Sequence, residues 1–591
     1  MIARRHAATC SVVAIGLAVL AFAGCKKDSK PVPQVPVEPI DGTSSLTSPG
    51  EGGDPLPGTT AEPQDGPVME VEPNSDRMTA TALPINGAIR GSLTRPEAGG
   101  AKDQDWFVLN LPAGNSQQVR LQLSPEDDSD YVLSWMPEVE PAKSKRRKRK
   151  RKSTALGRVD NAGKGGVEVL PPMVLAPGRH FFRVSVAKKR KKRRRRGPKA
   201  EIPFERPYRL SSTVVEPDPR VEQEPNQTRD TASVLRTAEP REGYLGWSQD
   251  SDWYRLDLGD APEGSFLRVD VTGVPDVKSR LWLTDKSGKS LVKAPEPKVH
   301  WSAGRAVTIR DISIKADRQP YYVEVRATRS ASPHERYTIK ATVDESSDSR
   351  EREPNWRPQN STPLTVETPM DGFMAHPTDW DTFRLDAQDP MVATVVVTGV
   401  EGVDLRLEHI DSSHKSVVKV NEGGVGAPET LPLVGVGPQP SYVRVTSKDH
   451  TFNVDTPYRI SVTMVDARGQ ELEPNDRVED AGRVTLRIGE PIKALVHPRG
   501  DLDYFALDAS SMSPGDKRVY KLSLTGVDGM TLAMHIYDRD KALITRKTSI
   551  GGGETKTITH GFSPGRYFVS VRADAPDSAS ADEKYTLELS E

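Results

Sequence analysis

A five-residue signature, Glu-x-Glu-Pro-Asn, recurs four times along this chain and constrains its fold more than any other feature. The copies span residues 70–74, 222–226, 351–355 and 471–475, and their asparagines are 152, 129 and 120 residues apart. A second motif, Asp-x-Asp leading into an aromatic segment, follows each copy, with its second aspartate 26 to 31 residues beyond the asparagine. Two motifs in a constant order, repeated at the size of a small domain, predict four tandem repeats.

Apolar and polar residues alternate with a period of two inside each repeat, which is typical of β-strands. Tyr254, Leu256 and Leu258 fall on one face of an extended segment, and residues 107–111 and 505–507 repeat the pattern. Further strands are expected at Tyr321–Val325, Tyr442–Val445 and Tyr567–Val571, and closing strands at Tyr208, Tyr337, Tyr458 and Tyr585. We expect the aromatic side chains to fill a core rather than to stack on a ligand.

Short alternating strands between glycine and proline turns predict an all-β protein. The expected architecture is four tandem antiparallel β-sandwiches of jelly-roll type. The expected boundaries are 68–218, 219–346, 347–467 and 468–591, and we refer to these segments as repeats 1 to 4.

At these motifs, the chain resembles the bacterial pre-peptidase C-terminal (PPC) domain family. The shared features are Glu-x-Glu-Pro-Asn, Asp-x-Asp-aromatic, Gly-x-Tyr-x-x-x-Val and the closing tyrosine strand, over about residues 68–591. The resemblance implies β-sandwiches of the kind appended to secreted proteases, where they bind matrix or assist secretion and processing.

The acidic signature suits a calcium ion, which takes about six to eight oxygen ligands. In an extended segment, Glu-x-Glu-x-Asn places three oxygen-bearing side chains on one face. The resemblance implies the same site, because calcium sites in collagenase PPC-like domains use this region. The alternative is that Glu-Pro-Asn only forms a turn and a cap. The candidate calcium ligands are Glu70, Glu72, Asn74, Asp105, Glu222, Glu224, Asn226, Asp252, Glu351, Glu353, Asn355, Asp381, Glu471, Glu473, Asn475 and Asp503, with the first aspartate of each Asp-x-Asp a weaker candidate.

Residues 1–25 have the pattern of a targeting segment. Two arginines and a histidine precede the apolar run 7–23, which ends in Phe22-Ala23-Gly24-Cys25. This ending resembles a bacterial lipobox and implies lipidation of Cys25 and a location in the cell envelope, anchored to the outer membrane on its periplasmic or surface face. A plain secretory signal or a short anchor is the alternative. Residues 26–67 contain nine prolines and are expected to form a disordered linker.

Two basic runs interrupt repeat 1, at residues 143–152 and 188–196. They hold 18 of the 82 basic residues, so 64 remain against 83 acidic residues, and the rest of the chain has a net charge of about −19. Such runs are expected to stay solvated and to bind polyanions by counterion release. The predicted partners are anionic polysaccharide, lipopolysaccharide, phospholipid headgroups or extracellular DNA. The alternative is loop expansion without a function.

The residues predicted to bind polyanions are Lys145, Arg146, Arg147, Lys148, Arg149, Lys150, Arg151, Lys189, Arg190, Lys191, Lys192, Arg193, Arg194 and Arg195. Whether the two runs leave the same end of repeat 1 depends on residues 156–159. A strand there predicts opposite ends, and a loop predicts a shared end.

Enzyme motifs such as His-Glu-x-x-His and Gly-x-Ser-x-Gly do not occur in the sequence, and its 11 histidines are scattered. We therefore expect a non-catalytic, lipid-anchored envelope protein that acts in binding or scaffolding, with protein partners and no small-molecule substrate. The alternatives are a periplasmic accessory factor for secretion or processing of other proteins and, third, an unrecognised hydrolase.

Overall fold

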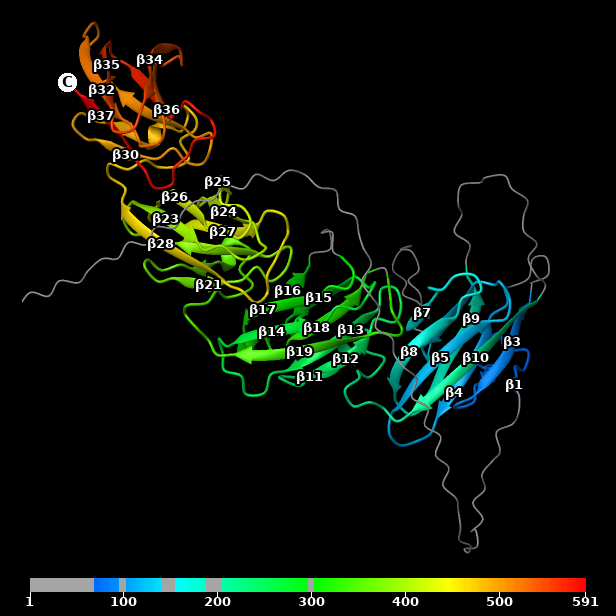
Figure 1. Ribbon diagram of the computed structural model, residues 1–591. Helices are drawn as coiled ribbons and strands as arrows, with labels where there is room; N and C mark the ends of the chain where they lie inside the picture. Colours follow the sequence, from blue (N-terminus) through cyan, green and yellow to red (C-terminus); the bar gives the residue numbers. More distant parts are fainter. Residues whose placement is uncertain (1–67, 95–101, 140–154, 188–204, 296–301, 329) are drawn as a thin grey trace, which may run out of the picture. The chain divides into compact units, whose positions relative to one another are not determined.

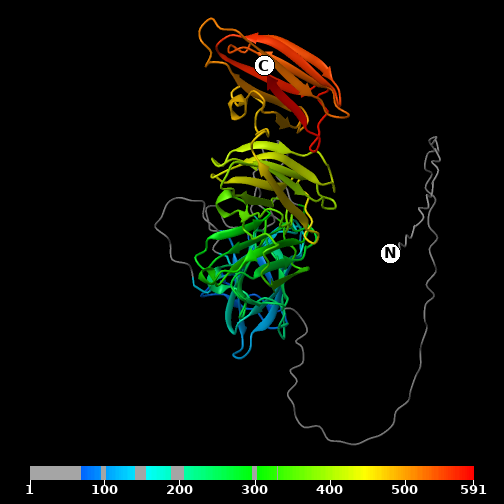
Figure 2. The same cartoon turned by 90° about the vertical axis from the view of Figure 1, so that its left-hand side faces the viewer.

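The computed structural model describes residues 68–94, 102–139, 155–187, 205–295, 302–328 and 330–591. The described residues form 37 β-strands and four short 3₁₀ turns, with no α-helix among them (Figures 1 and 2). None of the described helical turns is long or apolar enough to span a membrane. The predicted all-β class is confirmed, and the described residues between 68 and 591 belong to one compact unit.

Repeat 1 contains ten strands in two sheets, with the orders β1-β3-β10-β5-β8 and β2-β4-β9-β6-β7. The strands are β1 (Val68–Met69), β2 (Thr81–Ala82), β3 (Ala88–Thr94), β4 (Asp105–Leu111), β5 (Gln117–Pro125), β6 (Tyr131–Met136), β7 (Gly157–Val159), β8 (Glu168–Leu175), β9 (Gly178–Val186) and β10 (Glu205–Val215).

Repeats 2 to 4 each contain nine strands, in one five-stranded and one four-stranded sheet. The orders of repeat 2, β11-β13-β18-β15-β16 and β12-β19-β14-β17, recur with equivalent strands in repeats 3 and 4. Repeat 2 has β11 (Ser233–Arg236), β12 (Arg241–Tyr244), β13 (Ser251–Asp257), β14 (Phe266–Val271), β15 (Ser279–Thr284), β16 (Ser290–Ala294), β17 (Val307–Ser313), β18 (Tyr322–Ala327) and β19 (Arg336–Asp344).

Repeat 3 has β20 (Thr362–Pro363), β21 (Met370–Gly372), β22 (Trp380–Leu385), β23 (Met391–Val397), β24 (Leu405–Ile410), β25 (Ser416–Val420), β26 (Glu429–Val436), β27 (Ser441–Ser447) and β28 (Tyr458–Asp466). Repeat 4 has β29 (Thr485–Leu486), β30 (Ile492–Ala494), β31 (Leu502–Asp508), β32 (Arg518–Thr525), β33 (Leu532–Tyr537), β34 (Leu543–Ile550), β35 (Thr555–Phe562), β36 (Arg566–Ala573) and β37 (Tyr585–Ser590). The 3₁₀ turns are η1 (Arg229–Thr231), η2 (Ala316–Arg318), η3 (Pro358–Asn360) and η4 (Ala481–Arg483).

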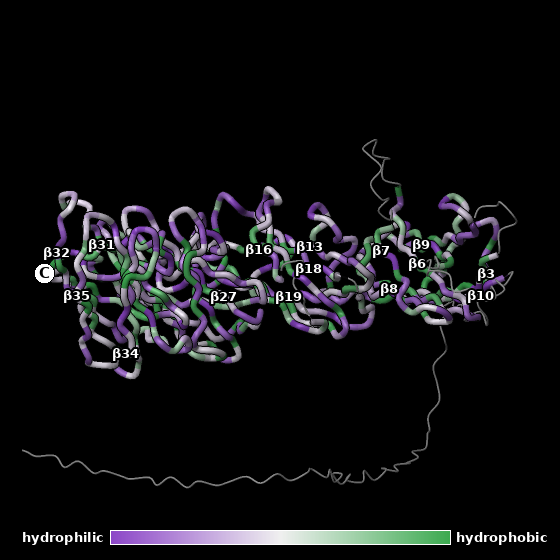
Figure 3. The backbone as a smooth tube through the Cα atoms, turned by 90° about the horizontal axis from the view of Figure 1, so that it is seen from above, coloured by the Kyte–Doolittle hydropathy of each residue, from purple (hydrophilic) through white to green (hydrophobic). Residues whose placement is uncertain are grey.

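The strands predicted from alternation are confirmed, including every closing tyrosine strand. In β13, Tyr254 and Leu256 are buried while Arg255 is exposed. Hydrophobic and hydrophilic positions alternate along the chain in Figure 3, because successive side chains of a strand point to opposite faces.

One detail departs from the antiparallel prediction. The first strand of each five-stranded sheet runs parallel to its neighbour, as β11 does to β13, and in repeat 1 the edge strand β1 is also parallel to β3. Parallel neighbours need a crossover connection. Here the chain makes it through the other sheet, because β12, which lies between β11 and β13 in the sequence, belongs to the four-stranded sheet.

Each repeat has one large buried cluster that draws residues from both of its sheets. In repeat 2, Leu256 and Val325 of the five-stranded sheet share this cluster with Val269 and Ile339 of the four-stranded sheet. Repeats 1, 3 and 4 have equivalent clusters. The two sheets of a repeat therefore enclose a common core, and this packing holds the loops that carry the acidic residues.

Candidate metal centres

A recurring backbone hydrogen bond joins the two sequence motifs of every repeat. The carbonyl of the signature asparagine accepts from the N–H that follows the second aspartate of Asp-x-Asp. The four N–H···O bonds run from Trp106 to Asn74, from Trp253 to Asn226, from Thr382 to Asn355 and from Tyr504 to Asn475, with N···O distances of 2.9 to 3.2 Å. Because that aspartate lies in a core strand, β13 in repeat 2, its position relative to the asparagine is set by the sheet.

Three carboxylates meet at this point in all four repeats, and one oxygen from each lies within 4.8 Å of the other two. These acidic clusters are Glu70, Glu72 and Asp105; Glu222, Glu224 and Asp252; Glu351, Glu353 and Asp381; and Glu471, Glu473 and Asp503. The structure therefore brings together the predicted ligands of each repeat. The clusters of repeats 2 and 4 are fully buried, whereas Glu72 in repeat 1 is exposed.

The first glutamate of each signature is held by several hydrogen bonds. In repeat 2, Glu222 Oε1 accepts from the backbone N–H of Tyr244 at 2.9 Å, and Oε2 accepts from Asn226 Nδ2 at 2.7 Å. The hydroxyl of Tyr254 also donates to Oε2 at 2.8 Å, and the hydroxyl oxygen of Tyr337 lies 3.1 Å from the same atom. This glutamate positions the asparagine and ties the signature to β12.

The second glutamate closes the turn that the signature forms. Glu224 Oε2 accepts from the backbone N–H of Asn226 at 2.8 Å, and the other repeats have the same bond at 2.8 to 2.9 Å. The Glu–Pro peptide bond is cis in all four copies. The turn that we considered as an alternative to a metal site is thus present, and it coexists with the acidic cluster.

The asparagine and the second aspartate each keep one buried oxygen without a hydrogen-bond partner among the described residues. Asn226 and Asp252 are fully buried, and both Oδ1 atoms lack a donor. In repeats 3 and 4, the second glutamate adds a third such oxygen. The full set is Asn74 Oδ1, Asp105 Oδ1, Asn226 Oδ1, Asp252 Oδ1, Glu353 Oε1, Asn355 Oδ1, Asp381 Oδ1, Glu473 Oε1, Asn475 Oδ1 and Asp503 Oδ1.

A buried oxygen without a partner costs roughly 1–3 kcal/mol, so its recurrence in four copies needs a physical reason. A hard cation supplies one, because it replaces the missing donors and offsets the clustered negative charge. The candidate ligand atoms are all oxygens, which suits calcium better than zinc or copper. The residues present therefore fit the predicted ion.

The closing tyrosine is a site residue that the sequence analysis assigned only to the core. All four closing tyrosines are fully buried, as predicted. Each also donates its hydroxyl to Oδ2 of the cluster aspartate, Tyr337 to Asp252 at 2.8 Å, and Tyr458 and Tyr585 to theirs at 2.6 Å. Tyr208 makes the same bond to Asp105. The sequence does contain an indication of this role, because the position is tyrosine in every repeat and never phenylalanine.

A glycine beside that tyrosine was also missed. Gly243 pairs with Tyr337 across β12 and β19, and a Cβ on Gly243 would lie 2.6 Å from Glu222 Oε1 and closer still to the tyrosine hydroxyl. Gly91 and Gly372 occupy the same place in repeats 1 and 3, whereas repeat 4 has Ala494. The glycine leaves room for the first glutamate to approach the tyrosine.

The first aspartate of Asp-x-Asp, the weaker candidate, shapes the adjoining loop instead. Asp250 Oδ2 accepts from the backbone N–H of Gly246 at 2.7 Å, and its Oδ1 accepts from that of Ser251 at 3.0 Å. Asp379 and Asp501 accept from loop N–H groups in the same way, at 2.6 and 2.7 Å. In repeat 1, Asp103 instead accepts from Thr94.

Burial raises the pKa values of the buried carboxyls in the clusters, and the neighbouring carboxylates raise several of them further. Desolvation raises the pKa of Glu222 to about 7 and, with the charge of Glu222, that of Glu224 to about 8. The pKa of Asp252 is raised well above its usual value by burial and then by Glu222. In repeats 1 and 4, burial and a neighbouring glutamate raise the pKa values of Asp105 and Glu473 to about 9.

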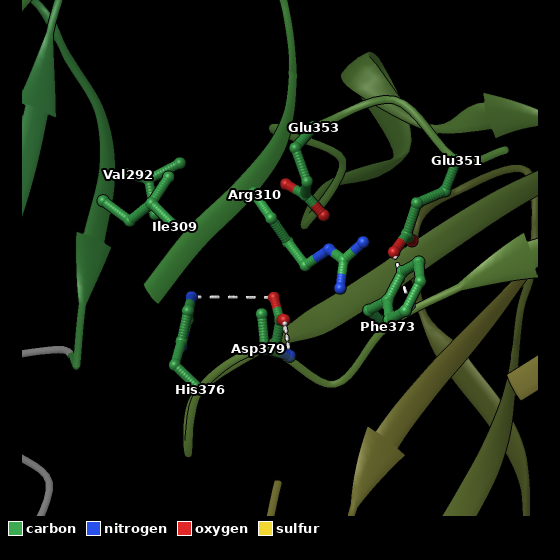
Figure 4. A pocket seen from close by; sticks show the side chains of 9 residues that line it. Val292, Ile309, Arg310, Glu351, Glu353, Phe373, His376 and Asp379 are labelled. Atoms are coloured by element: carbon green, nitrogen blue, oxygen red, sulfur yellow. Dashed lines mark hydrogen bonds and ion pairs between the residues drawn. The ribbon is translucent and has the colours of Figure 1, made fainter. Parts of the chain in front are cut away.

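The cluster of repeat 3 differs from the others because an arginine of repeat 2 reaches it. Arg310, in β17, points its guanidinium between Glu353 and Glu351 in Figure 4, and Nε donates to Asp311 at 2.9 Å. The guanidinium also lies 3.2 Å from the ring centroid of Phe373. Burial raises the pKa of Asp379, and the charges of His376 and Arg310 oppose that rise.

The predicted lipidation site and the polyanion-binding residues lie outside the described residues, as do the targeting segment and the linker. The strands that flank the basic runs are described. Met136, at the end of β6, pairs with Phe181 near the start of β9, and Val186, at the end of β9, pairs with Tyr131 at the start of β6. Since residues 157–159 form β7, the flanking strands lead to opposite ends of this sheet.

Comparisons with known proteins place few constraints on the chain. No family model and no curated protein matches it. Among solved structures, it is similar to the pre-peptidase C-terminal domain of collagenase from Bacillus anthracis, with 11% identity and a TM-score of 0.15, over 18% of this chain and 92% of that one. It is also similar to a triple jelly-roll structure from an archaeal virus turret, with 10% identity and a TM-score of 0.16, over 57% of this chain and 80% of the other. Neither likeness is close enough to transfer a function.

Proposed function

We propose that repeats 1 to 4 are PPC-like β-sandwich domains of jelly-roll type and that each binds one calcium ion at its acidic cluster. The observation that carries this proposal is the recurrence, in four copies, of buried asparagine and aspartate oxygens that have no hydrogen-bond partner within the described part of the chain. Paired sheets around a common core support the sandwich reading.

The proposed ion has a structural role. The asparagine and the second aspartate, and in repeats 3 and 4 also the second glutamate, supply the oxygens that have no hydrogen-bond donor among the described residues, and the first glutamate holds the asparagine in place. A bound divalent cation would offset the repulsion among the three clustered carboxylates, so the folded protein becomes more stable by mass action.

We further propose a non-catalytic, lipid-anchored envelope protein that acts in adhesion or scaffolding. Its support is the lipobox-like ending at Cys25, the proline-rich linker and the basic runs of repeat 1. Two acyl chains or more hold a protein stably on a membrane, and the basic runs would bind polyanions such as lipopolysaccharide, anionic polysaccharide or extracellular DNA.

The second candidate is a periplasmic accessory factor for the secretion or processing of other proteins. The resemblance to domains of secreted proteases favours it. Protease added to intact cells distinguishes the two candidate functions. A protein displayed on the cell surface is cleaved, whereas a periplasmic factor is protected by the outer membrane.

Calcium titration of the purified protein tests the metal proposal. We expect the melting temperature to rise with calcium relative to EDTA, and calorimetry to count four sites. Asp252→Asn keeps the size of the side chain and should reduce the count to three. Asp257→Asn, at the partly exposed end of the same strand, is the matched control and should leave four. An unchanged melting temperature would indicate that the Glu-x-Glu-Pro-Asn signature forms only a turn and binds no calcium.

A further inference from the structure

The second and third repeats form a basic groove that the calcium and lipid proposals do not use. The groove has a volume of about 680 Å³, within the size range of small-molecule sites. One wall comes from repeat 2, with Lys289 in the β15–β16 hairpin and Lys315 and Arg318 around η2. The other wall comes from repeat 3, between Arg352 and Pro363. We call it the junction groove.

Backbone contacts hold the two walls together. The N–H of Ser313, at the end of β17, donates to the carbonyl of Glu353 at 3.3 Å, and the N–H of Glu353 donates to the carbonyl of Asp311 at 2.9 Å. Within the repeat 2 wall, the N–H of Lys286 donates to the carbonyl of Arg318 at 3.0 Å. The groove is therefore built on strand ends and tight turns.

Positive charge dominates the lining. Five cationic side chains line the groove against one carboxylate, that of Glu353. Among the described residues, only Arg352 of these five has an acidic partner, Asp348 at 2.7 Å. Glu353 belongs to the acidic cluster of repeat 3, where its Oε2 accepts from the N–H of Asn355. An anionic ligand would thus meet four cations that have no ion pair within the described part of the chain.

An exposed aromatic ring lies next to these charges. Trp356 is 40% exposed, and the guanidinium of Arg357 lies 3.7 Å from its ring centroid. The equivalent positions after the signature asparagine are Ser75, Gln227 and Asp476 in the other repeats, so this aromatic residue is specific to repeat 3. Hydroxyl and amide side chains complete the lining: Ser290, Ser313, Gln359, Asn360, Ser361 and Thr362.

We propose that the junction groove binds a segment of an anionic sugar chain. The cations would contact its acidic groups, Trp356 would stack on a sugar ring, and the hydroxyl and amide groups would bond to sugar hydroxyls. A single-stranded nucleic acid fits less well, because proteins that bind it stack successive bases on several aromatic rings and the lining has one. This inference does not depend on the basic runs, and Glu353 is the one candidate calcium ligand in the groove lining.

Binding of short oligosaccharides tests the proposal by calorimetry. The background is the protein with both basic runs replaced by glycine–serine segments of equal length, so that the runs do not mask the groove. The probes are a galacturonic acid hexasaccharide for carboxylates and a heparin-derived hexasaccharide for sulfates. Maltohexaose and hexathymidylate are the neutral and nucleic-acid probes. We expect at least one acidic sugar to bind, more weakly as salt rises.

Two variants with matched controls locate the binding. Lys315→Gln with Arg357→Gln should weaken binding about tenfold, since it removes two exposed charge contacts. Trp356→Ala should weaken it about fivefold or more. Lys517→Gln with Arg518→Gln removes two exposed charges in repeat 4. Trp380→Ala removes a ring that is 42% exposed and has Arg444 over it at 5.2 Å. Both controls should bind as the parent does.

Three results would overturn the proposal: equal binding by the groove variants and their controls, maltohexaose binding as tightly as the acidic sugars, or groove-dependent binding of hexathymidylate alone. Preference between the two acidic hexasaccharides would identify carboxylate or sulfate as the recognised group. The groove substitutions affect exposed side chains, so an unchanged melting temperature is the check on folding.

Discussion

Within each acidic cluster, individual residues have different roles. Glu222 has both oxygens committed to hydrogen bonds, whereas Asn226 and Asp252 each retain one oxygen that has no partner among the residues the structure describes. Tyr337 fixes the aspartate, and Gly243 leaves space for the glutamate. Removing the tyrosine hydroxyl should therefore affect the site even though the ring remains in the core.

The raised pKa values at the clusters predict a pH dependence of stability. Without a cation, the pKa of Glu222 is about 7 and that of Glu224 about 8, both above the unfolded value of 4.5. The unfolded chain therefore ionises first, and the free energy of unfolding falls as the pH rises from about 4.5 to 8. In EDTA, we expect a lower melting temperature at pH 8 than at pH 5 from these groups.

Calcium favours the ionised carboxylates, so its stabilising effect should be larger at pH 8. A calcium effect that is equal at both pH values would contradict this.

A methyl group on Gly243 should disrupt the second site. Gly243→Ala would force the new Cβ against Glu222 and Tyr337 and cost roughly 1–3 kcal/mol in the free energy of unfolding. Repeat 4 already has Ala494 at this position, so Ala494→Gly is the control and should change the site much less. Urea unfolding with and without calcium measures both variants. Equal effects of the two substitutions would show that the glycine has no role in the site.

At the scale of an element, one tight hairpin recurs in repeats 2, 3 and 4. The turn residues Gly288, His414 and Lys541 all have positive φ, at 83°, 63° and 65°. Each donates its N–H to the aspartate that begins the turn, Asp285, Asp411 or Asp538. In the hairpin of repeat 2, around residues 285–288, the residue in the left-handed conformation is glycine.

Replacing Lys541 by glycine should stabilise the hairpin of repeat 4. A residue with a side chain is strained in the left-handed region, so we expect Lys541→Gly to raise the free energy of unfolding by about 0.5–1 kcal/mol. Lys541→Ala removes the same surface contact with Glu479 but keeps the strain, and it is the control. Urea unfolding measures both. A glycine variant no more stable than the alanine variant would exclude strain as the cause.

At the scale of the whole molecule, charge is divided unevenly. The basic runs hold 18 cationic residues, and the rest of the chain has a net charge of about −19. We expect replacement of both runs by glycine and serine to abolish retention on heparin at physiological salt. Replacing one run should give intermediate elution, because the flanking strands lead to opposite ends of one sheet and the runs act separately. Unchanged retention of the double variant would exclude the runs as the main polyanion-binding elements.

Much of the fold was predictable because it depends on local pattern. Alternation with a period of two identified β13, β18 and the closing strands, and four copies of the signature indicated four repeats. The parallel edge strands were not predictable. A two-residue strand such as β2 has too little sequence for a period, and its direction follows from the path of the chain between two sheets.

The sequence by itself determined the β-strands, the fourfold repetition and the residue types of the candidate ligands, because each of these features depends only on residues that are close together in the chain. Only the tertiary structure decided that Glu222 and Asp252 meet, that Tyr337 donates to the aspartate and that Gly243 makes room for both. It also placed Lys315 and Trp356 in the lining of one groove. These contacts join residues far apart in the chain, and strand register and the packing of two sheets bring them together.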